Sequence, residues 1–160
     1  MAETVSSEAA RRIEDFINDY AHCLDDGDFE GWPDFFEDDG HYQIISRESF
    51  EADLPIGVMH CDGRGMFEDR IRALRRASIF EPHVYCHVLG RPRITIAADG
   101  YYDVRTNLHV LRTMQDGRTD TFATGKYLDR IALGTDSCRL RERKVVLDSR
   151  RIDILLVVPL

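Results

Sequence analysis

The second half of the sequence is a series of β-rich segments separated by turn signals, and this pattern constrains the fold more than any other feature. Each segment is rich in Val, Ile, Thr, Tyr and Leu, and together they cover residues 83–97, 101–114, 118–133 and 138–149. The turn sequences between them are Asp99-Gly100, Asp116-Gly117 and Gly134-Thr135-Asp136. An Asp-Gly pair between such runs is a strong hairpin signal, so we expect consecutive antiparallel strands.

Helical periodicity dominates the first half of the chain. Apolar side chains recur at helical spacing from Ile13 to Leu24, after a capping serine at position 6 or 7, and Asp25-Asp26-Gly27 ends the run. In chain order we expect a helix ending near 25, a short helix over 28–36, a strand over 41–45, mostly loop over 53–65 and a helix over about 66–79. The apolar run at 152–160 either extends the sheet or leaves it.

Helices followed by an antiparallel meander predict an α+β fold, with the N-terminal helices packed on the concave side of a long curved sheet. Long strands twist, and Gly90 and Pro92 indicate a bulge or bend in the first of them. With 160 residues we expect a single domain spanning 1–160, which is long enough to bury a core. A cone of this kind has space for a small-molecule pocket.

The formal net charge of −8 is divided unevenly along the chain. Residues 1–60 contain 16 Asp and Glu against 3 Lys and Arg, whereas residues 61–160 contain 13 against 18. This balance argues against a nucleic-acid partner, because phosphate binding needs a concentrated basic surface. It leaves open whether the two charged halves face neighbouring subunits or only solvent. No apolar run reaches the roughly 18 residues of a membrane helix, so no membrane partner is expected.

The N-terminal sequence and the cysteines favour a cytoplasmic protein. MAETVSSEAARRIEDF is acidic and amphipathic and lacks the basic and apolar regions of a secretion signal. The cysteines are widely and irregularly spaced, with no C-x-x-C, and we expect free thiols at Cys23, Cys61, Cys86 and Cys138.

The stretch EPHVYCHVLG at 81–90 raises the question of a metal site, because His83, Cys86 and His87 are all possible ligands. In a strand, residues two apart share a face, so the two histidines point one way and Cys86 the other. Histidines four residues apart on a strand lie roughly 13 Å apart, too far to bind one ion. We therefore interpret the stretch as a strand with polar side chains.

Other catalytic and cofactor motifs are missing from the sequence. There is no H-E-x-x-H, no C-x-H followed by C-x-x-H, no glycine-rich phosphate loop and no G-x-S-x-G. Asp25, Asp26 and Asp28 crowd one turn, which the end of a helix and its cap explain. We assign no catalytic, cofactor-binding or metal-binding residue to this chain.

Segments along nearly the whole chain carry a family resemblance. They are WPDFFEDDGHY at 32–42, DRIRALR at 69–75, PHVYCHVLG at 82–90 and RERKVVLDS at 141–149, followed by an apolar C-terminus. In this order and spacing they resemble the small (beta) subunit of Rieske-type aromatic ring-hydroxylating dioxygenases. The resemblance favours the branch acting on single-ring aromatic carboxylates such as terephthalate, anthranilate, salicylate or benzoate. One departure is the strand entry, Pro82-His83-Val84, where many members have a Ser/Thr-Arg-His type of sequence.

The resemblance implies a cystatin-like α+β cone of the kind shared with nuclear transport factor 2. It implies a mainly structural subunit that assembles with a large alpha subunit, commonly as three alpha with three beta subunits, with the beta subunits forming a trimer. It also implies that the alpha subunit carries the Rieske [2Fe–2S] cluster and the mononuclear Fe(II). No cofactor is expected on this chain.

Arginines are the candidates for contacts with partner subunits, because their planar donors pair well with carboxylates. They are Arg70, Arg75, Arg141 and Arg143. The alternative is that these side chains pair with Asp or Glu inside the same domain.

The alternative function is a stand-alone isomerase, dehydratase or cyclase that acts on a hydrophobic small molecule in the cone. Such a site would use an Asp or His as general base and a Tyr as hydrogen-bond donor. The candidates are Asp25, Tyr42, His83, His87 and His109. An open apolar pocket with an Asp–His pair would favour this enzyme, and a cone filled by Trp32, Phe35 and Phe36 would favour the structural subunit. A pure binding module is a third possibility.

Overall fold

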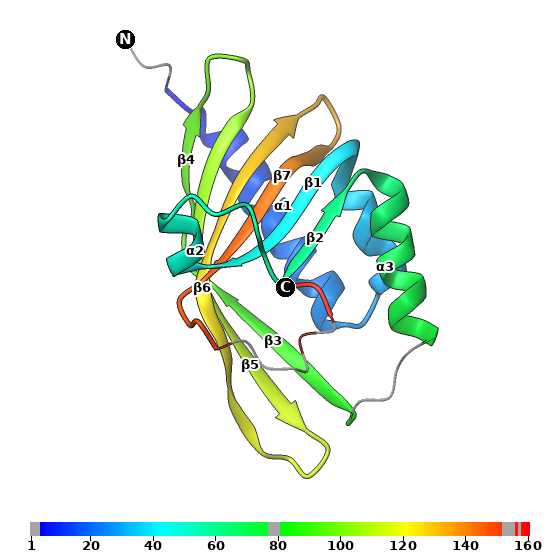
Figure 1. Ribbon diagram of the computed structural model, residues 1–160. Helices are drawn as coiled ribbons and strands as arrows, with labels where there is room; N and C mark the ends of the chain where they lie inside the picture. Colours follow the sequence, from blue (N-terminus) through cyan, green and yellow to red (C-terminus); the bar gives the residue numbers. More distant parts are fainter. Residues whose placement is uncertain (1–3, 77–80, 152–155, 157) are drawn as a thin grey trace.

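The computed structural model describes residues 4–76, 81–151, 156 and 158–160. The elements in chain order are α1 (Ser7–Asp25), η1 (Phe29–Phe35), β1 (Phe36–Ser46), α2 (Arg47–Glu51), β2 (Met59–Asp62), α3 (Arg64–Arg76), β3 (His83–Leu89), β4 (Arg93–Ile96), β5 (Tyr102–Met114), β6 (Thr119–Leu133) and β7 (Cys138–Leu147). They form a curved sheet with α1, η1 and α3 on one side (Figure 1), which confirms the predicted α+β fold.

The strands of the second half form the predicted antiparallel meander. In the described sheet the strand order is β2-β1-β7-β6-β5-β3, and β4 also pairs with β5. The predicted bend at Gly90 and Pro92 divides the first segment into β3 and β4. Both strands pair antiparallel with β5, where Leu89 lies opposite Leu108 and Arg93 lies opposite Arg105.

The N-terminal strands extend the sheet beyond β7 in a way that the sequence analysis does not predict. β1 runs parallel to β7, with Tyr42 opposite Arg143. β1 begins at Phe36, five residues before the predicted strand, and β2 lies within the predicted loop 53–65. In β2 the alternating residues Met59 and Cys61 are buried. Their pairing with β1 stabilises a strand too short to recognise from its own sequence.

The helices largely follow the prediction. Ser6 caps α1 by accepting a hydrogen bond from the Ala9 amide, and the helix ends at Asp25 as expected. The short second helix is a 3₁₀ helix that contains Pro33, and α2 was not expected. The third helix begins at Arg64, and the predicted residues 77–79 lie outside the described part.

The core lies between α1, η1, α3 and the concave face of the sheet. Its largest fully buried side chains include Trp32, Tyr20, Tyr42, Tyr127 and Phe67. From the predicted apolar run at 152–160, Val158 and Leu160 are buried in this core, whereas 152–155 and 157 lie outside the described residues.

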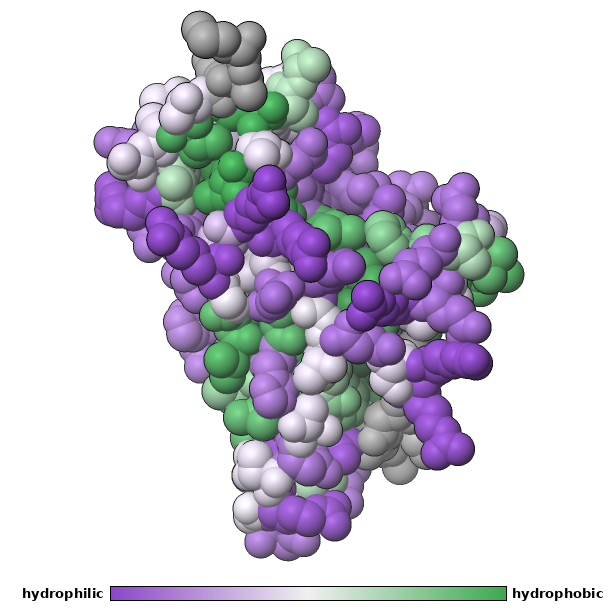
Figure 2. Space-filling view, turned by 90° about the vertical axis from the view of Figure 1, so that its left-hand side faces the viewer, coloured by the Kyte–Doolittle hydropathy of each residue, from purple (hydrophilic) through white to green (hydrophobic). Residues whose placement is uncertain are grey.

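The surface on the left-hand side of Figure 1 mixes polar and apolar residues. Figure 2 faces this side and shows hydrophilic and hydrophobic residues interspersed over it. Within the described residues, no helix combines the length and the apolar character needed to span a membrane.

Candidate functional site

The interior of the cone contains an ion pair with no exposed surface. Arg143 on β7 lies opposite Asp129 on β6 and donates two hydrogen bonds to its carboxylate, at 2.8 and 2.7 Å. Both side chains are fully buried. The guanidinium carbon lies 4.0 Å from the Tyr20 ring centre and 3.8 Å from that of Tyr127. The charge is thus stabilised by a bidentate carboxylate and by two aromatic faces.

The pKa of Arg143 shows which influence dominates. Burial alone would lower this pKa, but the carboxylate of Asp129 and the two tyrosines raise it above its usual value. The guanidinium therefore remains charged inside the core, between the rings of Tyr20 and Tyr127.

Tyrosine hydroxyls form further hydrogen bonds in the interior of the cone. The Trp32 indole donates to the Tyr20 hydroxyl at 2.9 Å, and the hydroxyls of Tyr20 and Tyr42 each donate to the Leu160 carbonyl at 3.0 Å. The Leu160 amide donates back to the Tyr42 hydroxyl at 2.9 Å. Burial raises the pKa of Tyr20 to about 12 and that of Tyr42 well above its usual value. Both hydroxyls consequently stay protonated and act as structural donors.

Asp25 and His87 form a second polar contact, which is partly buried. Asp25 Oδ1 lies 2.6 Å from His87 Nδ1, and Asp25 Oδ2 accepts the His87 amide at 2.9 Å. The His87 side chain has no exposed surface, and its Nε2 has no hydrogen-bond partner among the described residues. The contact ties the C-terminal end of α1 to β3. The strand also has the predicted alternation, because Cys86 is exposed where His87 is buried.

The other residues of the predicted pocket do not join this pair. Tyr42 is bonded to Leu160, and His83 Nδ1 lies 2.8 Å from the Glu81 carbonyl. His109 is on the outer face, because its neighbours Leu108 and Val110 are the buried residues of that strand, and its Nε2 contacts Thr121 at 2.9 Å. The structure thus brings together two of the five pocket candidates, Asp25 and His87.

The arginines predicted for subunit contacts differ in their surroundings. Arg75 donates to Glu30 at 2.6 and 2.7 Å, and Arg141 pairs with Asp39, both at exposed positions. Arg70 is half-buried, near enough to the Cys61 thiol to lower its pKa, although burial raises that pKa overall. The expectation that Arg143 reaches a partner does not hold, because this side chain has no exposed surface and pairs with Asp129.

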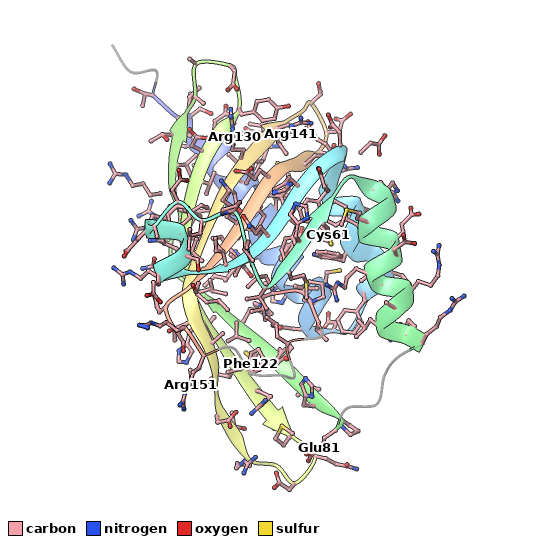
Figure 3. All side chains as sticks on the ribbon, viewed as in Figure 1. Cys61, Glu81, Phe122, Arg130, Arg141 and Arg151 are labelled. Carbon is pink, nitrogen blue, oxygen red and sulfur yellow. The ribbon has the colours of Figure 1, made fainter. Side chains whose placement is uncertain are left out.

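A groove of about 350 Å³ lies on the outer face of the sheet. Its lining is rich in charged side chains from four strands and includes Arg93, Arg105, Arg130 and Lys144 together with Asp103 and Glu142. Phe50 of α2 and Leu128 of β6 add apolar surface. Figure 3 labels Arg130 and Arg141 toward one end of this sheet.

Metal-ligating side chains converge at one place in the described part of the chain. The group consists of His41, His60 and Asp62 on β1 and β2. It contains no thiol, so it does not fit a Rieske cluster, which requires two Cys and two His ligands. This group was not predicted from the sequence, because His60 and Asp62 lie in the predicted loop 53–65, where the structure has the strand β2.

Comparisons with known proteins agree with the family resemblance described for the sequence. The family model described as "Ring hydroxylating beta subunit" matches residues 20–154. The anthranilate 1,2-dioxygenase small subunit of Burkholderia cepacia is 34% identical over 143 residues, covering 89% of each chain. The terephthalate 1,2-dioxygenase terminal oxygenase subunit beta 2 of Comamonas sp. is 39% identical over 141 residues, covering 88% of this chain and 92% of its own.

A solved structure supports the same relationship. It is the beta subunit of a candidate aromatic-ring-hydroxylating dioxygenase from Novosphingobium aromaticivorans, with 39% identity and a TM-score of 0.88. The match covers 98% of this chain and 100% of the solved one. This likeness confirms the α+β cone and the family resemblance identified in the sequence.

Proposed function

This chain belongs to the family of ring-hydroxylating beta subunits, and on that premise we propose that it is the structural beta subunit of an aromatic ring-hydroxylating dioxygenase. Its role is to hold a large catalytic subunit in its assembled form. The observation that carries the proposal is the packed interior. Trp32, the tyrosines Tyr20, Tyr42 and Tyr127, Leu160 and the Arg143–Asp129 pair are buried together between the helices and the sheet, which supports a structural role for this interior.

The partner and cofactors follow from the family. We propose a large alpha subunit that carries the Rieske cluster and the mononuclear iron, arranged as three alpha and three beta subunits. The donor set of this chain supports placing the cluster elsewhere, since the described residues bring no cysteine into a group of metal ligands. The names of the relatives support a single-ring aromatic carboxylate as the substrate of the complex.

We place this assembly in the cytoplasm. All four cysteines are free thiols in the structure, and Cys86 is exposed. Exposed free thiols suit a reducing compartment better than an oxidising one.

Co-expression with the large subunit tests the proposal. The partner used is a large subunit that carries the C-x-H and C-x-x-H motifs of a Rieske cluster. We expect the two chains to purify together and to oxidise an aromatic carboxylate when electrons are supplied. The chain purified alone is expected to show no turnover. Turnover of a small organic substrate by the isolated chain would refute the proposal.

Asp25→Asn separates a structural pair from a catalytic one. Asn retains an acceptor for the His87 amide but cannot act as a general base, whose loss typically costs about 10²–10⁴-fold in rate. We expect the assembled complex carrying Asp25→Asn to keep its turnover number within about twofold, because the pair lies outside the chemistry. His109→Gln, on the outer face, is the matched control. A loss of a hundredfold or more in an intact complex would contradict the structural role.

A further inference from the structure

We propose that His41, His60 and Asp62 form a binding site for a divalent transition-metal cation on the outer face of the β1–β2 pair. One ligand atom from each residue lies within 4.8 Å of the others. The inference concerns this chain alone and does not depend on the proposed dioxygenase partner.

The backbone ladder fixes the positions of the three residues. His41 lies directly opposite Asp62, and His60 lies opposite Gln43, two residues farther along β1. His41 and His60 are therefore diagonal neighbours on one face, where such side chains are within reach of each other. Their rings lie 4.8 Å apart between centroids, and His41 Nδ1 lies 3.6 Å from Asp62 Oδ1.

Only small side-chain movements are needed to close the site. Nitrogen and oxygen ligands bind zinc at about 2.0–2.2 Å, so ligand atoms around one ion lie roughly 3.4 Å apart in a tetrahedral arrangement. The His41–Asp62 distance of 3.6 Å already meets this value. His60 and Asp62 are exposed, so rotation of their side chains can shorten the remaining distances.

The donor chemistry selects the class of ion. Two imidazoles and one carboxylate favour Zn²⁺, Cu²⁺, Ni²⁺ or Co²⁺ over Mg²⁺ and Ca²⁺, which prefer oxygen ligands. Cys61 does not contribute, because it lies between His60 and Asp62 on the strand and its side chain is buried on the opposite face. Three protein ligands leave a position open for water.

The charges around the site are compatible with a cation. The residue beside His41 on β7 is Glu142, and Lys144, the next residue on the same face of that strand, lies 3.4 Å from the Glu142 carboxylate. His60 and Asp62 are exposed to solvent, and His41 is partly exposed. We therefore infer cation binding and assign no oxygen chemistry to the site.

Titration of the metal-free, tag-free chain tests the inference. ZnCl₂ is added to the apo protein in a calorimeter, and CoCl₂ is added in parallel to record visible absorption. We expect one Zn²⁺ per chain and a Co²⁺ spectrum of a low-coordinate site. His60→Ala and Asp62→Ala should each weaken Zn²⁺ binding by about tenfold or more, because even indirect perturbation of such sites costs about 10–100-fold.

His22→Ala is the matched control, because His22 is an exposed histidine in the last turn of α1. This variant should bind Zn²⁺ like the wild type. The inference is overturned if the wild type binds no Zn²⁺. It is also overturned if His60→Ala and Asp62→Ala, folded by circular dichroism, retain wild-type affinity, or if His22→Ala loses affinity to the same extent.

Discussion

Replacing Arg143 by methionine should destabilise the domain more than any surface change. The substitution leaves the Asp129 carboxylate in a fully buried position without its two charge-assisted hydrogen bonds. Removing one member of a buried pair costs about 3–5 kcal/mol, a large part of the roughly 5–15 kcal/mol that holds a typical domain together. For a chain of this size the melting temperature should fall by roughly 6–20 °C.

Urea unfolding followed by the fluorescence of Trp32 measures this loss. Trp32 is the single tryptophan of the chain, and its indole is bonded to Tyr20, whose ring contacts the Arg143 guanidinium. Arg141→Met is the matched control on the same strand. Its exposed pair with Asp39 is screened by water, so the unfolding midpoint should hardly change.

The double variant Asp129→Leu/Arg143→Met provides the decisive comparison. Removing both charges leaves no unpaired group, so its stability should return to within about 1–2 kcal/mol of the wild type. The reasoning is refuted if the double variant is as unstable as the sum of the two single variants. It is also refuted if Arg143→Met costs no more than the Arg141→Met control.

Two further changes have defined outcomes. Gly125→Ala should destabilise the sheet, because the new Cβ would lie 2.2 Å from the Val146 carbonyl oxygen, whereas Gly65→Ala meets no atom within 4 Å and should leave urea stability unchanged or slightly raised. Equal stability of the two alanine variants would contradict this. The hydrogen bonds from Arg75 lower the pKa of the Glu30 carboxyl to about 2. The pair's contribution is thus present above the ordinary Glu pKa and is lost as the pH falls toward 2. In Arg75→Ala, carboxyl NMR should show an ordinary Glu pKa, and an unchanged low value would contradict the assignment.

Local patterns were sufficient for the parts of the fold that are stabilised by near neighbours. The Asp-Gly turns and the alternation of β-branched residues predict the β5–β6 hairpin, and the apolar spacing predicts α1. The short strand β2 could not be predicted in this way. Its four residues form a strand because β1 lies beside them, and that pairing is not encoded by their own periodicity.

The pairs Asp25–His87 and Arg143–Asp129 could be predicted only from knowledge of which helices and strands lie against each other. Asp25 and His87 are 62 positions apart and meet because α1 ends over β3. The Arg143–Asp129 pair had a sequence signal, since Asp129 alternates with Tyr127 and Ile131 on the buried face of its strand. Because arginine side chains are mostly exposed in proteins, the sequence predicted a surface position for Arg143. The group of His41, His60 and Asp62 was not predicted, because the strand β2 that carries two of its members was not predicted.

The parallel pairing of β1 with β7 has a consequence for the order in which the chain acquires its structure during synthesis. β1 can pair with β7 only after Arg143, the partner of Tyr42 roughly 100 residues later in the chain, has been synthesised. Contacts so distant in sequence form slowly. A nascent chain would meanwhile present the open side of β1 to other polypeptides. Chaperones that shield unpaired strands should therefore raise the yield of this protein more than agents that promote helix formation.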